Sequence, residues 1–323
     1  MRNRVLLILM VLVGLMGPSA AEDWPTRPVT MVIPFAAGGA FDVLGRILAQ
    51  RMSEILGQQV VVENVAGAGG VIAAVRVAKG PPDGSQFILG DSSFAYNQAL
   101  YKNPRYNALT DFAPVALIAE QPTILIVRKE LPANTLAEFI AYARANQANM
   151  QYGSAGIGSP IHLACLLLNA TIGVNVTHIP YRGGAPAMQD MVGGRIDYLC
   201  PIAATAIATT NTGQAKPIAI LTRARFPAFP NLASAHEQGL ADFEAGSWNA
   251  LFLPKGTPAA IVERLHEATV AAMDTPRVAA RIAEVGAILV APERRSPDYL
   301  KNFIAREITK WSAPIKAANI ALE

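Results

Sequence analysis

The chain has 323 residues, with 27 Lys or Arg against 24 Asp or Glu, and a formal net charge of +3. Charge this balanced and dispersed excludes the basic surface of a nucleic-acid-binding protein and a polybasic membrane patch. The length exceeds what a single hydrophobic core usually organises, so the composition predicts two domains.

The first 21 residues have the pattern of a secretory signal peptide. Arg2 and Arg4 precede an apolar run at residues 5–17, and Ser19, Ala20 and Ala21 follow it. We predict cleavage after Ala21, because signal peptidase recognises such small residues. An uncleaved anchor helix is the alternative, although the apolar run is short for a membrane span. The pattern therefore predicts an exported protein.

Short apolar runs then alternate with longer amphipathic ones. The run "VTMVIPF" predicts a strand, and the spacing of Leu44, Ile47, Leu48 and Ile55 predicts a helix over Ala40–Leu56 that ends at Gly57. Further strands are predicted at "QVVVEN" and "SQFILGDSS", with a glycine turn and helix between them at "GAGGVIAAVRVAKG". Repeated strand–helix–strand units predict an α/β fold with a mainly parallel sheet flanked by helices.

A second series of strands and helices begins at Thr123–Val127. Its members are "TLAEFIAYARAN", "MQYGSAGIGSPIHLACLLLNATIG", "VNVTHIPY", "GGAPAMQDMVGGRIDYLCP" and "AKPIAILT". After the strand "SWNALFLP" the chain returns to long helices. We predict one lobe from residues 22–122 and 250–323 and a second from 123–249, with two crossing strands as the hinge.

Glycine turns precede three of the predicted helices, at residues 38–39, 67–70 and 153–158. A helix N-terminus presents unpaired N–H groups with a partial positive charge, and glycine lets a ligand approach them. Such turns predict an anion site without Lys or Arg, to which Ser154 and Ser159 would add hydroxyl groups. The alternative is that glycine only permits a tight turn. The turn at Gly67 and Gly69 also imitates a dinucleotide motif, but its acidic partner is poorly placed, so no cofactor is predicted.

Asp42 is the only charge near the first turn, and two roles are open to it. It could accept hydrogen bonds from the start of its own helix, or it could bind an ammonium group of the ligand. We favour the first role, and hence a ligand without an amine. Ser159 and His162 leave an exported hydrolase as a competing function, although their spacing on a helix is more typical of an N-cap serine. No cluster with the usual metal-ligand spacing is evident.

Two cysteines, Cys165 and Cys200, lie in apolar segments. Export permits a disulfide between them, and two buried thiols are the alternative.

The order of these motifs resembles the extracytoplasmic solute receptors of tripartite tricarboxylate transporters, the Bug or TctC-like family. The stretches "VIPFAAGGAFDVLGRIL", "PPDGSQFILG", "YGSAGIGSPIHL", "IPYRGGAPAMQDMVGGRID" and "SWNALFLPKGTP" carry the resemblance. It implies a monomeric two-lobed periplasmic binding protein of type II, with no catalytic residue, cofactor or metal. Such a receptor holds a small organic acid between its lobes and delivers it to membrane transporter subunits, although a sensor for a membrane kinase would have the same pattern.

By this resemblance the ligand lies between the loops Phe35 to Asp42 and Ser154 to Ser159. Phe41 stands where the family often has threonine, and Ala36 and Ala37 leave only backbone donors in the first loop. The predicted ligand-binding residues are Phe35, Ala36, Gly38, Gly39, Ala40, Asp42, Ser92, Ser154, Ala155, Gly158, Ser159 and Asp197.

Overall fold

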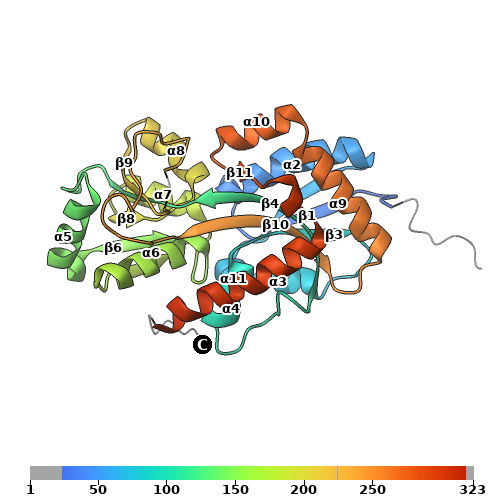
Figure 1. Cartoon of the computed structure of the whole chain (residues 1–323), viewed down its shortest axis with the longest axis horizontal. Coiled ribbons are helices and arrows are strands. Elements are labelled where there is room, and N and C mark those ends of the chain that lie inside the picture. The colour runs from blue at the N-terminus through green and yellow to red at the C-terminus, as the bar shows by residue number, and fades with distance from the viewer. Residues whose placement is uncertain (1–23, 224, 318–323) are drawn as a thin grey trace, which may run out of the picture.

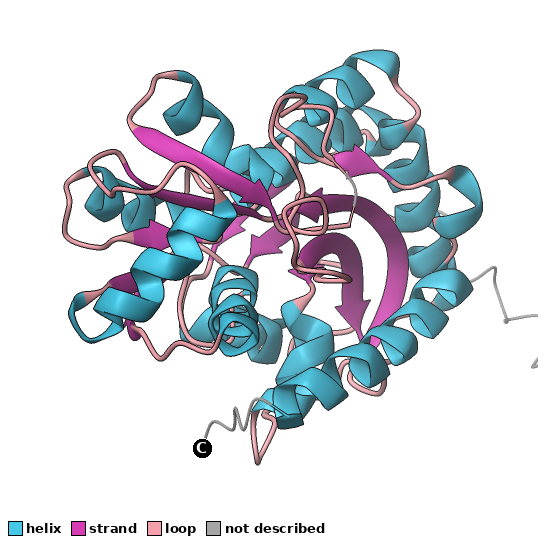
Figure 2. Cartoon of the chain, turned by 60° about the vertical axis from the view of Figure 1, so that its left-hand side comes forward, coloured by secondary structure: helices cyan, strands magenta, loops and turns pink. Residues whose placement is uncertain are grey.

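Two β-sheets flanked by helices form the protein in the computed structural model, which describes residues 24–223 and 225–317 (Figures 1 and 2). One sheet has the strand order β11-β4-β10-β3-β1-β2, and we call it with its helices the first lobe. The other has the order β7-β6-β8-β5-β9 and forms the second lobe. The predicted signal peptide lies outside the described residues. Within the described ranges, no helix combines the length and apolarity that a membrane span requires.

The first lobe begins as the sequence predicts. Strand β1 (Val29–Ile33) pairs in parallel with β2 (Val60–Asn64) and β3 (Gln86–Asp91). Helix α2 (Ala40–Leu56) has the predicted limits, buries Leu44, Ile47 and Leu48, and ends at Gly57 in the left-handed conformation. The remaining helices of this lobe are η1 (Ala68–Gly70), α3 (Val71–Ala78), α4 (Ser93–Leu100), α9 (Ala259–Met273), α10 (Pro276–Glu284), η3 (Pro292–Arg294) and α11 (Pro297–Ala317).

Two long strands, β4 (Phe112–Pro122) and β10 (Gly246–Pro254), run antiparallel through the first sheet and extend toward the second lobe (Figure 1). The chain leaves the first lobe through β4 and returns through β10. For this reason β10 is antiparallel to β3 as well. The short strand β11 (Ile288–Leu289) is also antiparallel to β4. The sheet is therefore mixed rather than mainly parallel as predicted. Just beyond the two strands, the Thr123 hydroxyl donates to the Ala245 carbonyl.

The second lobe also has a mixed sheet, in which β6 is parallel to β7 and β8, and β5 is antiparallel to β8 and β9. Its elements are β5 (Ile124–Arg128), α5 (Leu136–Asn146), η2 (Gln147–Asn149), β6 (Gln151–Ser154), α6 (Pro160–Ile172), β7 (Thr177–Pro180), α7 (Gly184–Val192), β8 (Tyr198–Leu199), α8 (Ala203–Asn211) and β9 (Ala215–Ile220). The residue limits predicted for the two lobes stay a prediction.

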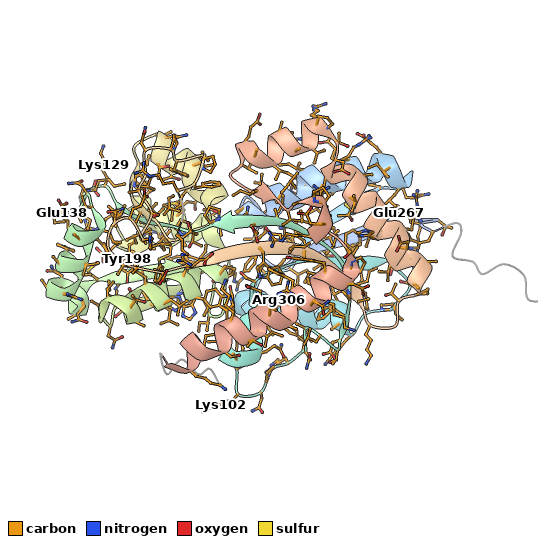
Figure 3. The ribbon with its side chains drawn as sticks, in the orientation of Figure 1. Lys102, Lys129, Glu138, Tyr198, Glu267 and Arg306 are labelled. Atoms are coloured by element: carbon orange, nitrogen blue, oxygen red, sulfur yellow. A yellow bond between two sulfur atoms is a disulfide. The ribbon has the colours of Figure 1, made fainter. Side chains whose placement is uncertain are left out.

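The interior of the second lobe contains a disulfide between Cys165 in α6 and Cys200, with the two Cα atoms 5.3 Å apart. Of the two possibilities left open by the sequence, the bridge is the one that the structure contains. Beside it Tyr198 is fully buried, whereas Lys129 and Glu138 project outward from the lobe (Figure 3).

Candidate functional site

The loop between β1 and α2 is held by Asp42, which is 4% exposed. One carboxylate oxygen accepts the N–H of Gly38 at 2.9 Å, and the side chains of Arg46 and Asn64 each donate to Asp42 at 3.0 Å. Gly38 has φ +81°, a left-handed conformation that glycine adopts without strain. Asp42 thus accepts from the residue directly before Gly39, the N-cap of α2.

Asp42 is ionised in this environment. Burial alone would raise the pKa of its carboxyl group, but hydrogen bonds from Arg46, Gly38 and Asn64 outweigh burial and hold the pKa below its usual value. The carboxylate points back into its own loop, and Arg46 offsets its charge. A negative ligand beside the N-terminus of α2 therefore meets a carboxylate that is already paired.

The corresponding loop of the second lobe joins β6 to α6. Ser159 is the N-cap of α6, because its Oγ accepts the N–H of His162 at 3.3 Å. The Gly158 N–H donates to His162 Nδ1 at 3.3 Å. At the other end of the loop, Ser154 Oγ accepts the N–H of Gly156 at 3.0 Å and lies 2.7 Å from His178 Nε2.

Two histidines support this loop in their neutral form. The rings of His162 and His178 are 4.3 Å apart and lie beside Tyr152. Burial lowers the pKa of His162 to about 3, with a further contribution from His178, and burial lowers that of His178 to about 4. The Ser159 hydroxyl serves as a helix cap and His162 Nδ1 accepts a backbone N–H. Ser159 and His162 are therefore arranged as a supported turn and not as a nucleophile beside its base.

The glycine loops of the two lobes lie against each other. The Ala36 N–H donates to the Arg182 carbonyl at 3.2 Å, across the lobe boundary. A Cβ added at Gly69 would lie 2.0 Å from the Ile157 carbonyl oxygen, and one at Gly183 would lie 3.0 Å from Ala36 Cβ. The lobes are therefore closed on one another at these loops.

An apolar cluster fills part of the same junction. Phe35 and Phe41 stack with their ring centroids 4.9 Å apart. Both belong to a buried group with members from each lobe: Ile33, Phe35, Ala40, Phe41, Ala155, Ile161 and Ile202. Phe41, the departure from the family pattern, thus contributes to the packing between the lobes.

Most of the predicted site residues come together at this junction. The first loop supplies Phe35, Ala36, Gly38, Gly39, Ala40 and Asp42, and the second supplies Ser154, Ala155, Gly158 and Ser159. Ser92 lies toward the crossing strands, where its Oγ is 2.9 Å from Ser247 Oγ.

Asp197 is placed away from this junction. Its carboxylate accepts the Arg128 Nε at 2.9 Å and the Gln151 N–H at 2.8 Å. Gln151 begins β6, whereas the candidate loop follows Ser154 at the other end of that strand. Asp197 therefore forms an ion pair at the opposite end of these strands from the candidate loop, because β8 runs parallel to β6 and Asp197 precedes β8.

Sequence reasoning missed four polar residues near the junction. Each is at most 1% exposed and has a side-chain oxygen or nitrogen without a hydrogen-bond partner: Asp91, Asn97, Gln121 and Asn249. The available signal was a polar residue inside or directly after an apolar strand or helix, as in "ILGDSS" and "SWNALFLP". Such residues rarely remain buried without a role.

A cavity of about 490 Å³ in the first lobe touches one of these four residues, Asn97, and Ala68, Tyr101 and Arg105 also line it. Ala68 belongs to the second glycine turn. In the described part of the chain, no group of three His, Cys, Asp or Glu side chains is arranged to hold a metal ion.

Residues 44–320 match the model of the family described as "Tripartite tricarboxylate transporter family receptor". Three solved structures share the fold over their whole length. "Periplasmic binding protein BugD" is 35% identical with a TM-score of 0.89, and the comparison covers 93% of this chain and 100% of that one. MatC from Rhodopseudomonas palustris, solved with bound malate, is 38% identical with a TM-score of 0.88, over 90% and 100% of the two chains.

The third structure, Rpa4515 of the same organism with adipate, is 36% identical with a TM-score of 0.87, over 93% of this chain and 100% of that one. The family match spans most of the chain, and the three structures agree in overall arrangement. The chain therefore belongs to the tripartite tricarboxylate transporter receptor family.

Proposed function

We propose that this protein is a periplasmic solute-binding receptor that captures a small carboxylate between its lobes and delivers it to the membrane subunits of a tripartite tricarboxylate transporter. One observation carries the proposal: the loops that begin α2 and α6 come from different lobes and meet at one junction. Both helices are long enough to have a substantial dipole, with 17 and 13 residues. The start of a helix leaves backbone N–H groups without carbonyl partners in the helix, and such groups suit a carboxylate. In α6 Pro160 has no N–H and Ser159 Oγ already accepts that of His162, so the loop before the helix supplies the remaining donors.

The same arrangement explains how the receptor would open. β4 and β10 connect the lobes, and we propose that two bodies rotate about these strands. The first body consists of residues 22–122 and 250–323, and the second of residues 123–249. Contacts between the loops, such as that of Ala36 with Arg182, form only when the lobes are close. A ligand that bridges the two helix N-termini would stabilise the closed state.

We propose that the protein binds its ligand without changing it. In support, Ser159 caps α6 and His162 Nδ1 accepts a backbone N–H, so neither is arranged for nucleophilic attack. Relatives of known structure hold malate and adipate as bound acids. Export to the periplasm and a monomeric state are parts of the same proposal.

A thermal-shift screen of mono-, di- and tricarboxylates, aromatic acids and amino acids tests this function. An acid that binds only the folded state at a hundredfold excess over its Kd stabilises the protein by about 2.7 kcal/mol. We call the acid with the largest shift the reference acid, and we expect chromatography to recover it unchanged. Absence of a shift with every acid would refute the function, and turnover of the reference acid would favour the hydrolase.

A further inference from the structure

The four buried polar residues form a row, which we call the polar seam: Asp91, Asn97, Gln121 and Asn249. The row begins at the crossing strands, where Asn249 of β10 lies opposite Asp91 of β3. Gln121 of β4 lies opposite Ser247, whose hydroxyl is 2.9 Å from that of Ser92. This half of the seam thus belongs to the strands that connect the lobes.

The other half of the seam reaches the second lobe. A Cβ added at Gly158 would lie 3.0 Å from Asn97 Oδ1, so this oxygen faces the loop that begins α6. Asp91 is linked to Asn97 through two residues: its Oδ1 accepts the Ser93 N–H at 2.6 Å, and the Tyr106 hydroxyl contacts both the Ser93 carbonyl and Asn97 Nδ2. The seam therefore runs from the hinge to the loop on which the proposed carboxylate site depends.

The hydrogen bonds around Asn97 fix which of its atoms is free. The Tyr106 hydroxyl donates to the Ser93 carbonyl at 3.4 Å, so it must accept from Asn97 Nδ2, which lies 3.2 Å away. Asn97 Oδ1 remains, and it is an acceptor without a partner. Asp91 Oδ2 is likewise an acceptor without a partner.

Buried acceptors without partners are costly, and proteins seldom keep several together. Burial also raises the pKa of Asp91 to about 7, because its carboxylate has lost water. A hydrogen-bond donor from a ligand would relieve both penalties. The amides of Gln121 and Asn249 are also unpartnered on both atoms, so either end of each can turn toward the ligand.

We propose that the polar seam recognises a hydrogen-bond donor on the carbon chain of the bound acid, either a hydroxyl or an ammonium group. Asp91 Oδ2 and Asn97 Oδ1 accept from this donor, while the helix N-termini hold the carboxylate. The inference rests on the proposed function and adds a second point of recognition. It makes Asp91, rather than Asp42, the acidic group that the ligand meets.

Calorimetry with two matched series tests the inference: succinate, malate and aspartate, and propionate, lactate and alanine. Within each series only one substituent changes, from hydrogen to hydroxyl to ammonium. We expect the wild type to bind the best donor-bearing member of a series at least about tenfold more tightly than the member without a donor. Asp91→Asn and Asn97→Ala should each reduce this ratio, and Asp83→Asn, an exposed control, should leave it unchanged.

The two sources of the donor give different results. Loss confined to aspartate or alanine in Asp91→Asn identifies an ammonium group, because its bond to a carboxylate is charge-assisted. Loss with malate or lactate identifies a hydroxyl. Equal affinity within both series in the wild type, or an unchanged ratio in both folded variants, would overturn the inference but not the proposed function. Binding of none of the six acids would also overturn it, and the thermal-shift screen would still decide the proposed function.

Discussion

Replacing Gly69 with alanine should prevent full closure of the lobes. The added Cβ would lie 2.0 Å from the Ile157 carbonyl oxygen and 2.9 Å from two further backbone atoms of the second lobe, Ile157 C and Gly158 C. Backbone atoms cannot rotate away, so the loops must separate. Overpacking of this kind costs about 1–3 kcal/mol. If the cost falls on the closed state alone, affinity for the reference acid should fall between about fivefold and about 150-fold.

Gly57→Ala is the matched control. Gly57 has φ +70° and Gly69 has φ +59°, so both variants carry the strain of a left-handed alanine. A Cβ at Gly57, however, would have no neighbour within 4 Å. Calorimetry measures affinity, and small-angle X-ray scattering measures the compaction that the reference acid induces. If Gly69→Ala bound and compacted as Gly57→Ala does, the contact between the loops would have no part in closure.

Three further predictions concern the supports of the site. Asp42→Asn should lower the free energy of unfolding by about 1 kcal/mol near neutral pH, the usual effect of weakening an acceptor at the start of a helix. The pKa of Asp42 is lowered in the folded protein, so the difference in denaturant midpoint between variant and wild type should become smaller as the pH falls below the ordinary aspartate pKa. In the folded protein the pKa values of His162 and His178 are about 3 and 4, below the ordinary histidine value, so protons bind preferentially to the unfolded chain. The free energy of unfolding should therefore decrease as the pH falls from about 6.5 toward 4, by up to about 1.4 kcal/mol per histidine per pH unit. A melting temperature that does not change over this range would contradict the prediction. Replacing Cys165 and Cys200 with alanine removes a link that closes a separation of 35 residues and should cost about 3–4 kcal/mol, an effect that a reductant should reproduce in the wild type but not in the variant.

Local patterns were sufficient to predict many elements. Helix α2 has its predicted limits, because its apolar spacing and the left-handed Gly57 are both local properties. Strand direction depends on distant pairings instead. The antiparallel pairing of β4 with β10 joins segments far apart in sequence, and alternation of strands and helices could not reveal it.

The candidate site likewise has features that the sequence reveals and features that only the fold reveals. Glycine turns before helices are visible in sequence, and two of them, in different lobes, meet at the junction. Asp197 was wrongly assigned to the site because the sequence does not show that β8 runs parallel to β6. Asp197 precedes β8 and therefore lies at the opposite end of these strands from the loop that follows β6. The polar seam was missed because Asp91 and Asn249 are ordinary polar letters until the fold places them opposite each other and buries both.

In the proposed site, Asp42 and Asp91 would have different roles toward an acidic ligand. Asp42 has three donors within its own lobe, and its lowered pKa keeps it charged beside Arg46. Asp91 has one donor and a raised pKa near 7, so it can lose or share its proton at little cost near neutral pH. Asp42 holds its own loop, whereas Asp91 is the residue that we propose responds to the bound ligand. Recognition by backbone N–H groups would then define the class of ligand, and the response of Asp91 would distinguish its members.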